Sequence, residues 1–183
     1  LGFLYVTDLL APFADDITAL LRERTGVQHW VGSTGIGICA TGREYLDEPA
    51  MAVMLADLAP GSFQVLSGVR TPDDLKMRKF NCGERQANFA IVHADPANSS
   101  VPELIEGLAG RVESGFVVGG LSSSRAENLQ IAEKTHDGGV SGGTLERPAL
   151  KRLLADIAAG RPIFLAVLGG LPPHYLTTQP KFQ

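Results

Sequence analysis

The sequence predicts an α/β fold in which two internally related strand-helix-strand units form a mixed, largely parallel sheet. The runs at 1–8 and 89–95 are short, continuously apolar and stopped by an aspartate, which is the pattern of a buried strand. An amphipathic segment follows each run, and a second apolar run then closes on a glycine. The two units align without a gap: Gly119 follows Gly32 by 87 positions, and the other matched residues have the same offset. A strand, a crossover helix and a returning strand imply parallel pairing within each unit.

The first unit spans about residues 1–57. Its helix is expected to begin at Pro12, because the fixed φ and missing amide hydrogen of proline suit a first helical position, and to end at Gly26. A strand over 29–31 then leads into a glycine-rich turn. The apolar segment 50–58 fits either a strand or a helix, since its alanines and methionines show no decisive period.

The second unit spans about residues 88–143 and has clearer start signals. Ser100 and Glu103 fit a capping box, in which each side chain satisfies a free amide at the helix start. Apolar residues then follow with helical spacing, which predicts one buried face. A returning strand over 115–121 completes the unit.

The connector between the units, residues 58–87, differs in character. Its part from 69 to 86 is polar and basic, which predicts an exposed loop, with phosphate binding as the alternative. Beyond the second unit, a helix is expected from Pro148 to just before Gly160. A short strand over 162–168 and an extended tail follow.

The composition is that of a globular protein with its own core, since 44% of the 183 residues are hydrophobic and 20% are charged. The net charge of −4 argues against a nucleic-acid partner, which would require a basic face. No apolar run approaches the roughly 20 residues of a membrane helix, so membrane insertion is not expected. Cys39 and Cys82 follow no metal or redox spacing, which favours reduced thiols and a cytoplasmic location.

The first glycine-rich turn, Gly32-Ser33-Thr34-Gly35, has the composition of a ligand-binding loop. Its glycines allow backbone amides to turn inward, and its hydroxyls both donate and accept hydrogen bonds. The sequence is neither a dinucleotide fingerprint nor a P-loop, and a simple tight turn is the alternative. Arg43 is the cation best placed to meet a carboxylate ligand, although an exposed ion pair is the commoner arrangement.

The matching turn of the second unit holds Gly119, Gly120, Leu121, Ser122 and Ser123. Two glycines followed by hydroxyls again offer hydrogen-bond donors without charge. A serine nucleophile is the alternative, but the G-x-S-x-G pattern of a nucleophile elbow is absent. We therefore expect the two turns to bind a small ligand between the two units, and we expect no catalytic residue.

Four titratable side chains are further candidates for chemistry. His93 lies at the end of a predicted strand, at the sheet edge where parallel sheets bind ligands. It is either a ligand contact or a hydrogen-bonded structural residue. Asp8 and Asp95 lie at matching strand ends of the two units. There they either form an acid-base pair or cap the loops that follow the strands. Cys39 is a weak candidate for a thiol nucleophile. No two histidines have metal-ligand spacing, so no metal site is expected.

The order and spacing of several motifs resemble the FIST family of small-ligand sensory domains. The main motifs are GFLYVTD, HWVGSTGIG, GREY and FVVGGLSS, at residues 2–8, 29–37, 42–45 and 116–123. Shorter matches at 130–132 and 137–142 extend the resemblance over 1–143, the FIST N-terminal domain. Residues 144–183 resemble part of the FIST C-terminal domain. The chain departs from the family in two ways: Ser33 replaces a cysteine that many members carry, and a usual segment is expected to be missing near 143–147.

The resemblance implies a bacterial, cytoplasmic, non-catalytic domain that binds a small metabolite, such as an amino acid or a small carboxylate, for signal transduction. No cofactor is expected for that activity. The alternative implied by the family is a haem-dependent nitric-oxide sensor that regulates a histidine kinase, with His93 or His29 as the haem ligand. A hydrolase that uses Asp8, Asp95 or Ser122 is the least expected function.

Overall fold

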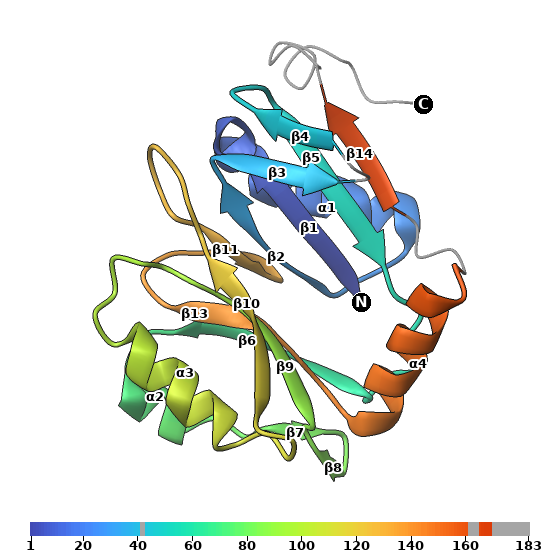
Figure 1. Ribbon diagram of the computed structural model, residues 1–183, viewed down its shortest axis with the longest axis vertical. Helices are drawn as coiled ribbons and strands as arrows, with labels where there is room; N and C mark the ends of the chain where they lie inside the picture. Colours follow the sequence, from blue (N-terminus) through green and yellow to red (C-terminus); the bar gives the residue numbers. More distant parts are fainter. Residues whose placement is uncertain (41–42, 161–164, 170–183) are drawn as a thin grey trace.

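The computed structural model describes residues 1–40, 43–160 and 165–169, and it contains two mixed β-sheets that face each other (Figure 1). The strands of the larger sheet are β1 (Gly2–Thr7), β2 (Trp30–Gly35), β5 (Ala50–Leu55), β11 (Gln130–Ala132), β12 (Lys134–His136) and β14 (Leu165–Gly169). Those of the smaller sheet are β6 (Phe63–Val69), β9 (Phe89–Ala94), β10 (Phe116–Leu121) and β13 (Val140–Leu145). Their spatial orders are β12-β11-β2-β1-β5-β14 and β10-β9-β13-β6.

Two hairpins and five helical segments complete the described chain. The hairpins are β3 (Gly37–Ala40) with β4 (Arg43–Leu46), and β7 (Asn81–Cys82) with β8 (Arg85–Gln86). The helices are the 3-10 helix η1 (Asp8–Phe13) and the α-helices α1 (Ala14–Thr25), α2 (Pro72–Lys76), α3 (Val101–Ala109) and α4 (Arg147–Ala158).

The α/β class is confirmed, and both strand-helix-strand units are present. Strands β1 and β2, which precede and follow α1 in the sequence, pair in parallel. Strands β9 and β10, which precede and follow α3, also pair in parallel. The other strand pairs of the described chain are antiparallel. The expected predominance of parallel strands is therefore not observed, because the added strands enter the sheets without crossover helices.

Alternating side chains along the strands divide the interior into three packed layers. Leu4 faces α1, whereas its neighbours Phe3 and Tyr5 face the smaller sheet. Val92 of β9 packs toward α3 on the outer side of the smaller sheet. Leu145 lies in the central layer between the sheets, where residues of α4 also pack. The order of layers is thus helix, sheet, sheet, helix (Figure 1).

The helix starts differ from those expected from the sequence. Pro12 lies inside η1, and α1 begins at Ala14, while its predicted end at Gly26 is confirmed by a left-handed φ of 74°. Ser100 makes no side-chain cap at the start of α3. Its amide instead donates to the side chain of Asn98 at 2.8 Å, so a local turn takes the place of the predicted capping box.

The connector 58–87 contains more regular structure than its polar composition predicts. Strand β6 lies in it and pairs with β13 at the edge of the smaller sheet. Helix α2 follows, with a capping box between Thr71 and Asp74. Leu75 and Phe80 are buried in the same core as α3, so the predicted exposed loop is corrected to a packed segment.

The remaining expectations concern 50–58 and the chain after α3. The first segment forms β5, because it pairs with β1 and β14 on both edges. The predicted helix after Pro148 is α4, and β14 overlaps the predicted strand at 162–168. Residues 162–164 of that strand and the tail after 169 lie outside the described residues.

Candidate functional site

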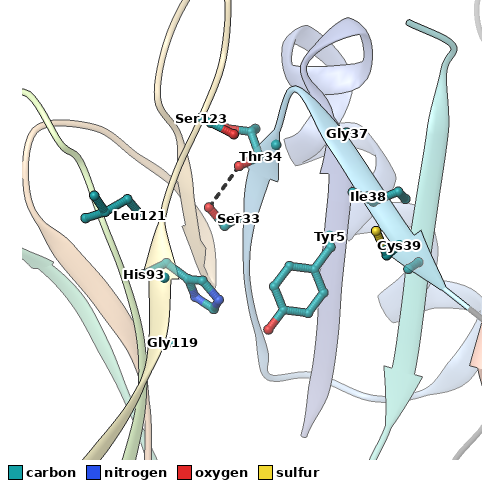
Figure 2. Close-up of a pocket in the computed structure, with 13 residues that line it drawn as sticks. Tyr5, Ser33, Thr34, Gly37, Ile38, Cys39, His93, Gly119, Leu121 and Ser123 are labelled. Carbon is teal, nitrogen blue, oxygen red and sulfur yellow. Dashed lines mark hydrogen bonds between the residues drawn. The ribbon is translucent and has the colours of Figure 1, made fainter. Parts of the chain in front are cut away.

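A cavity of about 470 Å³ lies where the carboxyl ends of β1, β2, β9 and β10 meet. Residues of β3 and β5 form its remaining wall (Figure 2). Its volume falls within the range of about 300–1,000 Å³ that is usual for small-molecule sites. Open α/β sheets bind ligands at the carboxyl edge of their parallel strands, so its position is that of a ligand site.

Tyr5 and His93 lie at the centre of this cavity. Both point from facing strands into the space between the sheets, and Figure 2 shows their rings directed toward each other. The ring centroids are 5.3 Å apart with an interplanar angle of 71°, an edge-on contact. Burial lowers the pKa of His93 to about 4 and raises the pKa of Tyr5, so both rings are neutral at pH 7.

Hydrogen bonds join the two glycine-rich motifs beside the cavity. The Oγ atoms of Ser33 and Ser122 are 2.7 Å apart, and both side chains are buried. Oγ of Ser122 also accepts a bond from Nε2 of Gln130 at 3.1 Å. The amide of Ser123 donates to the carbonyl of Thr34 at 3.2 Å. The two motifs, which lie far apart in the sequence, are therefore in direct contact.

Several backbone amides of these motifs already have hydrogen-bond partners. The amide of Thr34 donates to the carbonyl of Leu129 at 3.0 Å, and that of Ser122 donates to the carbonyl of Ala94 at 2.8 Å. The expected nest of free amides is not formed at these positions, because β2 and β10 extend through most of the two motifs. The cavity's polar groups therefore come mainly from side chains, and β10, the edge strand of the smaller sheet, lines it with residues 119–121.

Three glycines of these motifs have different structural requirements. A Cβ atom at Gly32 or at Gly119 would lie 1.6 Å from a carbonyl oxygen of the neighbouring strand, so neither position accepts a larger residue. A Cβ at Gly120 would meet nothing within 4 Å. Gly120 is opposite His93 in the sheet, so its side chain would point to the same face and into the cavity.

Seven of the ten residues predicted as ligand contacts line the cavity: Ser33, Thr34, Gly35, Gly119, Gly120, Leu121 and Ser123. Gly32 and Ser122 do not line it, because they are enclosed in strand pairing and in the serine bond. Arg43 also lies outside it. Its guanidinium stands 4.6 Å from the ring of Tyr45 and pairs with Glu48 at 3.6 Å, which is the ion-pair alternative.

Five lining residues were not predicted as ligand contacts: Tyr5, Gly37, Ile38, Cys39 and Ala52. Alternation along the first strand is the signal that identifies Tyr5, since it shares a face with the buried Phe3. No comparable signal identifies Ile38 and Cys39, because their position depends on how the β3–β4 hairpin folds over β5.

Asp8 and Asp95 act as loop caps in this structure. Oδ1 of Asp95 accepts the amide of Ala97 at 2.9 Å, and Oδ2 accepts the amide of Gly138 at 3.0 Å. Asp8 accepts the amide of Arg125 at 3.0 Å. Neither carboxylate lines the cavity, so the capping alternative describes both residues better than an acid-base pair.

His29 lies in a second cavity, of about 900 Å³, away from His93. Nδ1 of His29 is 2.7 Å from Oε1 of Glu133, and its ring makes an edge-on contact with Phe63. The two histidines line different cavities, so they are separate candidates as a haem ligand and would not bind the same haem.

Within the ranges 1–40, 43–160 and 165–169, no three His, Cys, Asp or Glu side chains gather in a way that could hold a metal ion. The helices of this part of the chain are also too short or too polar to cross a membrane.

A family model described as the FIST N domain matches residues 1–154 of this chain. The chain belongs to the FIST family. FIST domains are sensory domains that commonly bind small ligands, and every residue of the smaller cavity lies within the matched region. The match reaches into α4, and a division between 1–143 and a partial second domain at 144–183 stays a prediction. No curated protein and no solved structure matches the chain significantly.

Proposed function

We propose that this FIST protein is a cytoplasmic, non-catalytic sensor that binds a small metabolite in the cavity between β2 and β10. The observation that carries the proposal is that two hydroxyl-bearing glycine motifs, from separate units of the chain, line one cavity at the carboxyl ends of four strands. Ser122 supports the non-catalytic assignment, because its hydroxyl is enclosed and bonded to Ser33 and Gln130. A nucleophile would instead need access to its substrate.

A continuous set of hydrogen bonds offers a route from this cavity to the surface. The bond between Ser33 and Ser122 links the larger sheet to the end of β10, and Gln130 continues from Ser122. Nε2 of Gln130 donates to the carbonyl of Asn128, whose side chain donates to Asp95 in the loop before α3. A ligand that changes the spacing of the sheets would shift this loop, where a bacterial histidine kinase or another signalling protein would detect it.

The family resemblance favours an amino acid or a small carboxylate as the ligand. The described residues that line the cavity include no Lys, Arg, Asp or Glu. A carboxylate would therefore be held by hydroxyls and by backbone groups of β10, without an opposing charge. A screen must for this reason contain neutral metabolites beside amino acids and carboxylates.

Thermal-shift screening with such a library tests the proposal. A ligand at 100 times its Kd stabilises a protein by about 2.7 kcal/mol, which corresponds here to a rise in Tm of roughly 5–10 °C. Gly120→Val should abolish the rise, because its side chain would project into the ligand space, where a Cβ at this position meets no atom within 4 Å. Gln28→Leu, in the second cavity, is the matched control and should leave the rise intact. A hit that stabilises the Gly120→Val variant equally, or a screen without any hit, contradicts the proposal.

A haem-dependent nitric-oxide sensor is the second candidate, and His29 is the histidine that favours it. Histidines that bind metals usually donate their other ring N–H to a carboxylate, as the contact between His29 and Glu133 allows. Phe63 and Val65 give the surrounding cavity apolar walls. Haem added to the purified protein should then produce a shifted Soret band that His29→Ala removes and His93→Ala retains. An unshifted Soret band for the unmodified protein removes this candidate.

A further inference from the structure

The polar groups of the smaller cavity divide into those that bond one another and those with hydrogens still available. Ser33 and Thr34 belong to the first group, since their hydroxyls make protein hydrogen bonds at 2.7 and 3.2 Å. Ser123 belongs to the second: its Oγ accepts the amide of Ile36 at 3.1 Å, and its own hydrogen has no acceptor among the described residues. The phenol of Tyr5 likewise has no hydrogen-bond partner in the described part of the chain.

His93 adds a third donor because of how its two ring nitrogens are placed. His93 is only 5% exposed, and its Nδ1 is enclosed without a hydrogen-bond partner. Nε2 is not enclosed in this way, so we place it as the nitrogen that faces the cavity. A neutral imidazole carries one proton. Among buried backbone groups, an N–H without an acceptor is rarer than a carbonyl without a donor, and by the same preference we assign the proton of His93 to Nε2. His93 therefore presents an N–H to the cavity.

The cavity has donors but no cation to balance a charged ligand. Its lining in the described chain is free of Lys and Arg, and the nearby guanidinium of Arg43 is directed to Glu48 and Tyr45. The residues of β10 that line the cavity, Gly119, Gly120 and Leu121, are uncharged. Burying a carboxylate without an opposing charge is costly, whereas a neutral carbonyl gains hydrogen bonds at a much smaller desolvation cost.

We propose that this cavity selects an uncharged ligand with a carbonyl or similar acceptor oxygen, which accepts hydrogen bonds from His93 and Tyr5. Its apolar part would lie on Ile38 and Ala52, the hydrophobic side chains of the opposite wall. This inference rests on the proposed function, because it assigns a ligand class to the same cavity. It replaces the amino acid or carboxylate with a neutral amide, ester, lactone or ketone.

Matched pairs of small molecules that differ in charge test this inference. Suitable probes are benzamide with benzoate, nicotinamide with nicotinate, and N-acetylleucinamide with N-acetylleucine, each titrated by calorimetry at pH 7.5. The neutral member of a binding pair should bind at least tenfold more tightly than the charged member. Equal or tighter binding of the charged member would overturn the inference.

Variants of the two donors provide the second test. Tyr5→Phe removes only the hydroxyl and should weaken the best neutral probe about three- to tenfold. His93→Leu should weaken it by about tenfold or more, whereas His93→Gln, which keeps an N–H, should stay closer to the unmodified protein. Imidazole ¹⁵N shifts should show the proton of His93 on Nε2. A proton on Nδ1, or unchanged affinity in both Tyr5→Phe and His93→Leu, contradicts the inference.

The two proposals fail in different ways in this experiment. Charged probes that bind, and that Gly120→Val excludes, would overturn the choice of a neutral ligand and retain the cavity as the sensor site. Probes that bind the Gly120→Val variant unchanged would overturn both proposals. Failure of every probe and of the wider screen to bind would also overturn both.

Discussion

Gly119 and Gly120 are adjacent in one strand and yet have opposite structural requirements. A Cβ at Gly119 would lie 1.6 Å from the carbonyl oxygen of Val92, and its φ of 144° is one that larger residues rarely adopt. Gly119→Ala should therefore lower the free energy of unfolding by at least about 3 kcal/mol, through the clash and the backbone strain together. Gly120→Ala, which meets no atom, should change it by no more than about 0.5 kcal/mol. Urea unfolding of the two variants measures both values, and similar losses in both would contradict the structure.

The buried imidazole of His93 predicts a specific dependence of stability on pH. Its pKa is lowered from 6.5 to about 4 in the folded protein, so the unfolded chain binds a proton between these values while the folded protein does not. The free energy of unfolding should therefore fall as the pH falls, with a contribution from His93 of about 2 kcal/mol between pH 7.5 and pH 5.

His93→Gln isolates this contribution, because the other titrating groups stay the same. Urea unfolding at pH 7.5 and at pH 5.0 should show a smaller loss of stability in the variant, by about 2 kcal/mol. The same pH dependence in both proteins would mean that His93 is not buried in its neutral form.

Individual residues were predictable from the sequence where a local rule decides them. Gly32 and Gly119 occupy matching positions of the two units, and both positions require glycine. The reason is the close approach of the neighbouring backbone and not the turn that we expected. The capping box predicted at Ser100 was wrong, because the side chain of Asn98 accepts the amide of Ser100, which the Glu103 side chain was expected to accept. Tyr5 was missed as a ligand contact: strand alternation places it on the same face as Phe3, but its position opposite His93 depends on the packing of the two sheets.

At the scale of elements, the bond between Ser33 and Ser122 joins β2 to the end of β10. Ser33→Ala and Ser122→Ala should each lower the free energy of unfolding by about 1–3 kcal/mol, because each leaves a buried hydroxyl without this partner. The double variant should lose less than the sum of the two, with a coupling of about 1 kcal/mol, since it removes both partners together. Denaturant unfolding of the four proteins in this cycle measures the coupling, and purely additive losses would show that the bond contributes nothing.

The elements that the sequence predicted well have a strong internal period or a clear end signal. The strands β1 and β9 are continuous apolar runs, and α1 ends at Gly26 as expected. Strand β6 was missed because its sequence, FQVLSGV, mixes apolar residues with Gln, Ser and Gly and shows no clean alternation. Helix α2 was missed because its five residues, PDDLK, contain a single large apolar side chain among charges. Burial of Leu75 and Phe80 depends on contacts with α3, which no local pattern reveals.

At the scale of the whole molecule, the two parallel strand pairs turn their carboxyl ends toward one cavity, and this arrangement accounts for the site. Local sequence predicts each pair, since a strand, a helix and a strand imply a parallel crossover. It does not predict how the two sheets face each other. That packing depends on the antiparallel strands β5, β11 and β13 and on a central layer drawn from both sheets.

The most direct test of the central claim is a crystal structure of the protein with the tightest neutral probe from the matched pairs. The account predicts electron density for the probe between Tyr5 and His93, with its oxygen within hydrogen-bond distance of Nε2 of His93. Density in the second cavity beside His29 and Glu133, with the smaller cavity left to solvent, would contradict it.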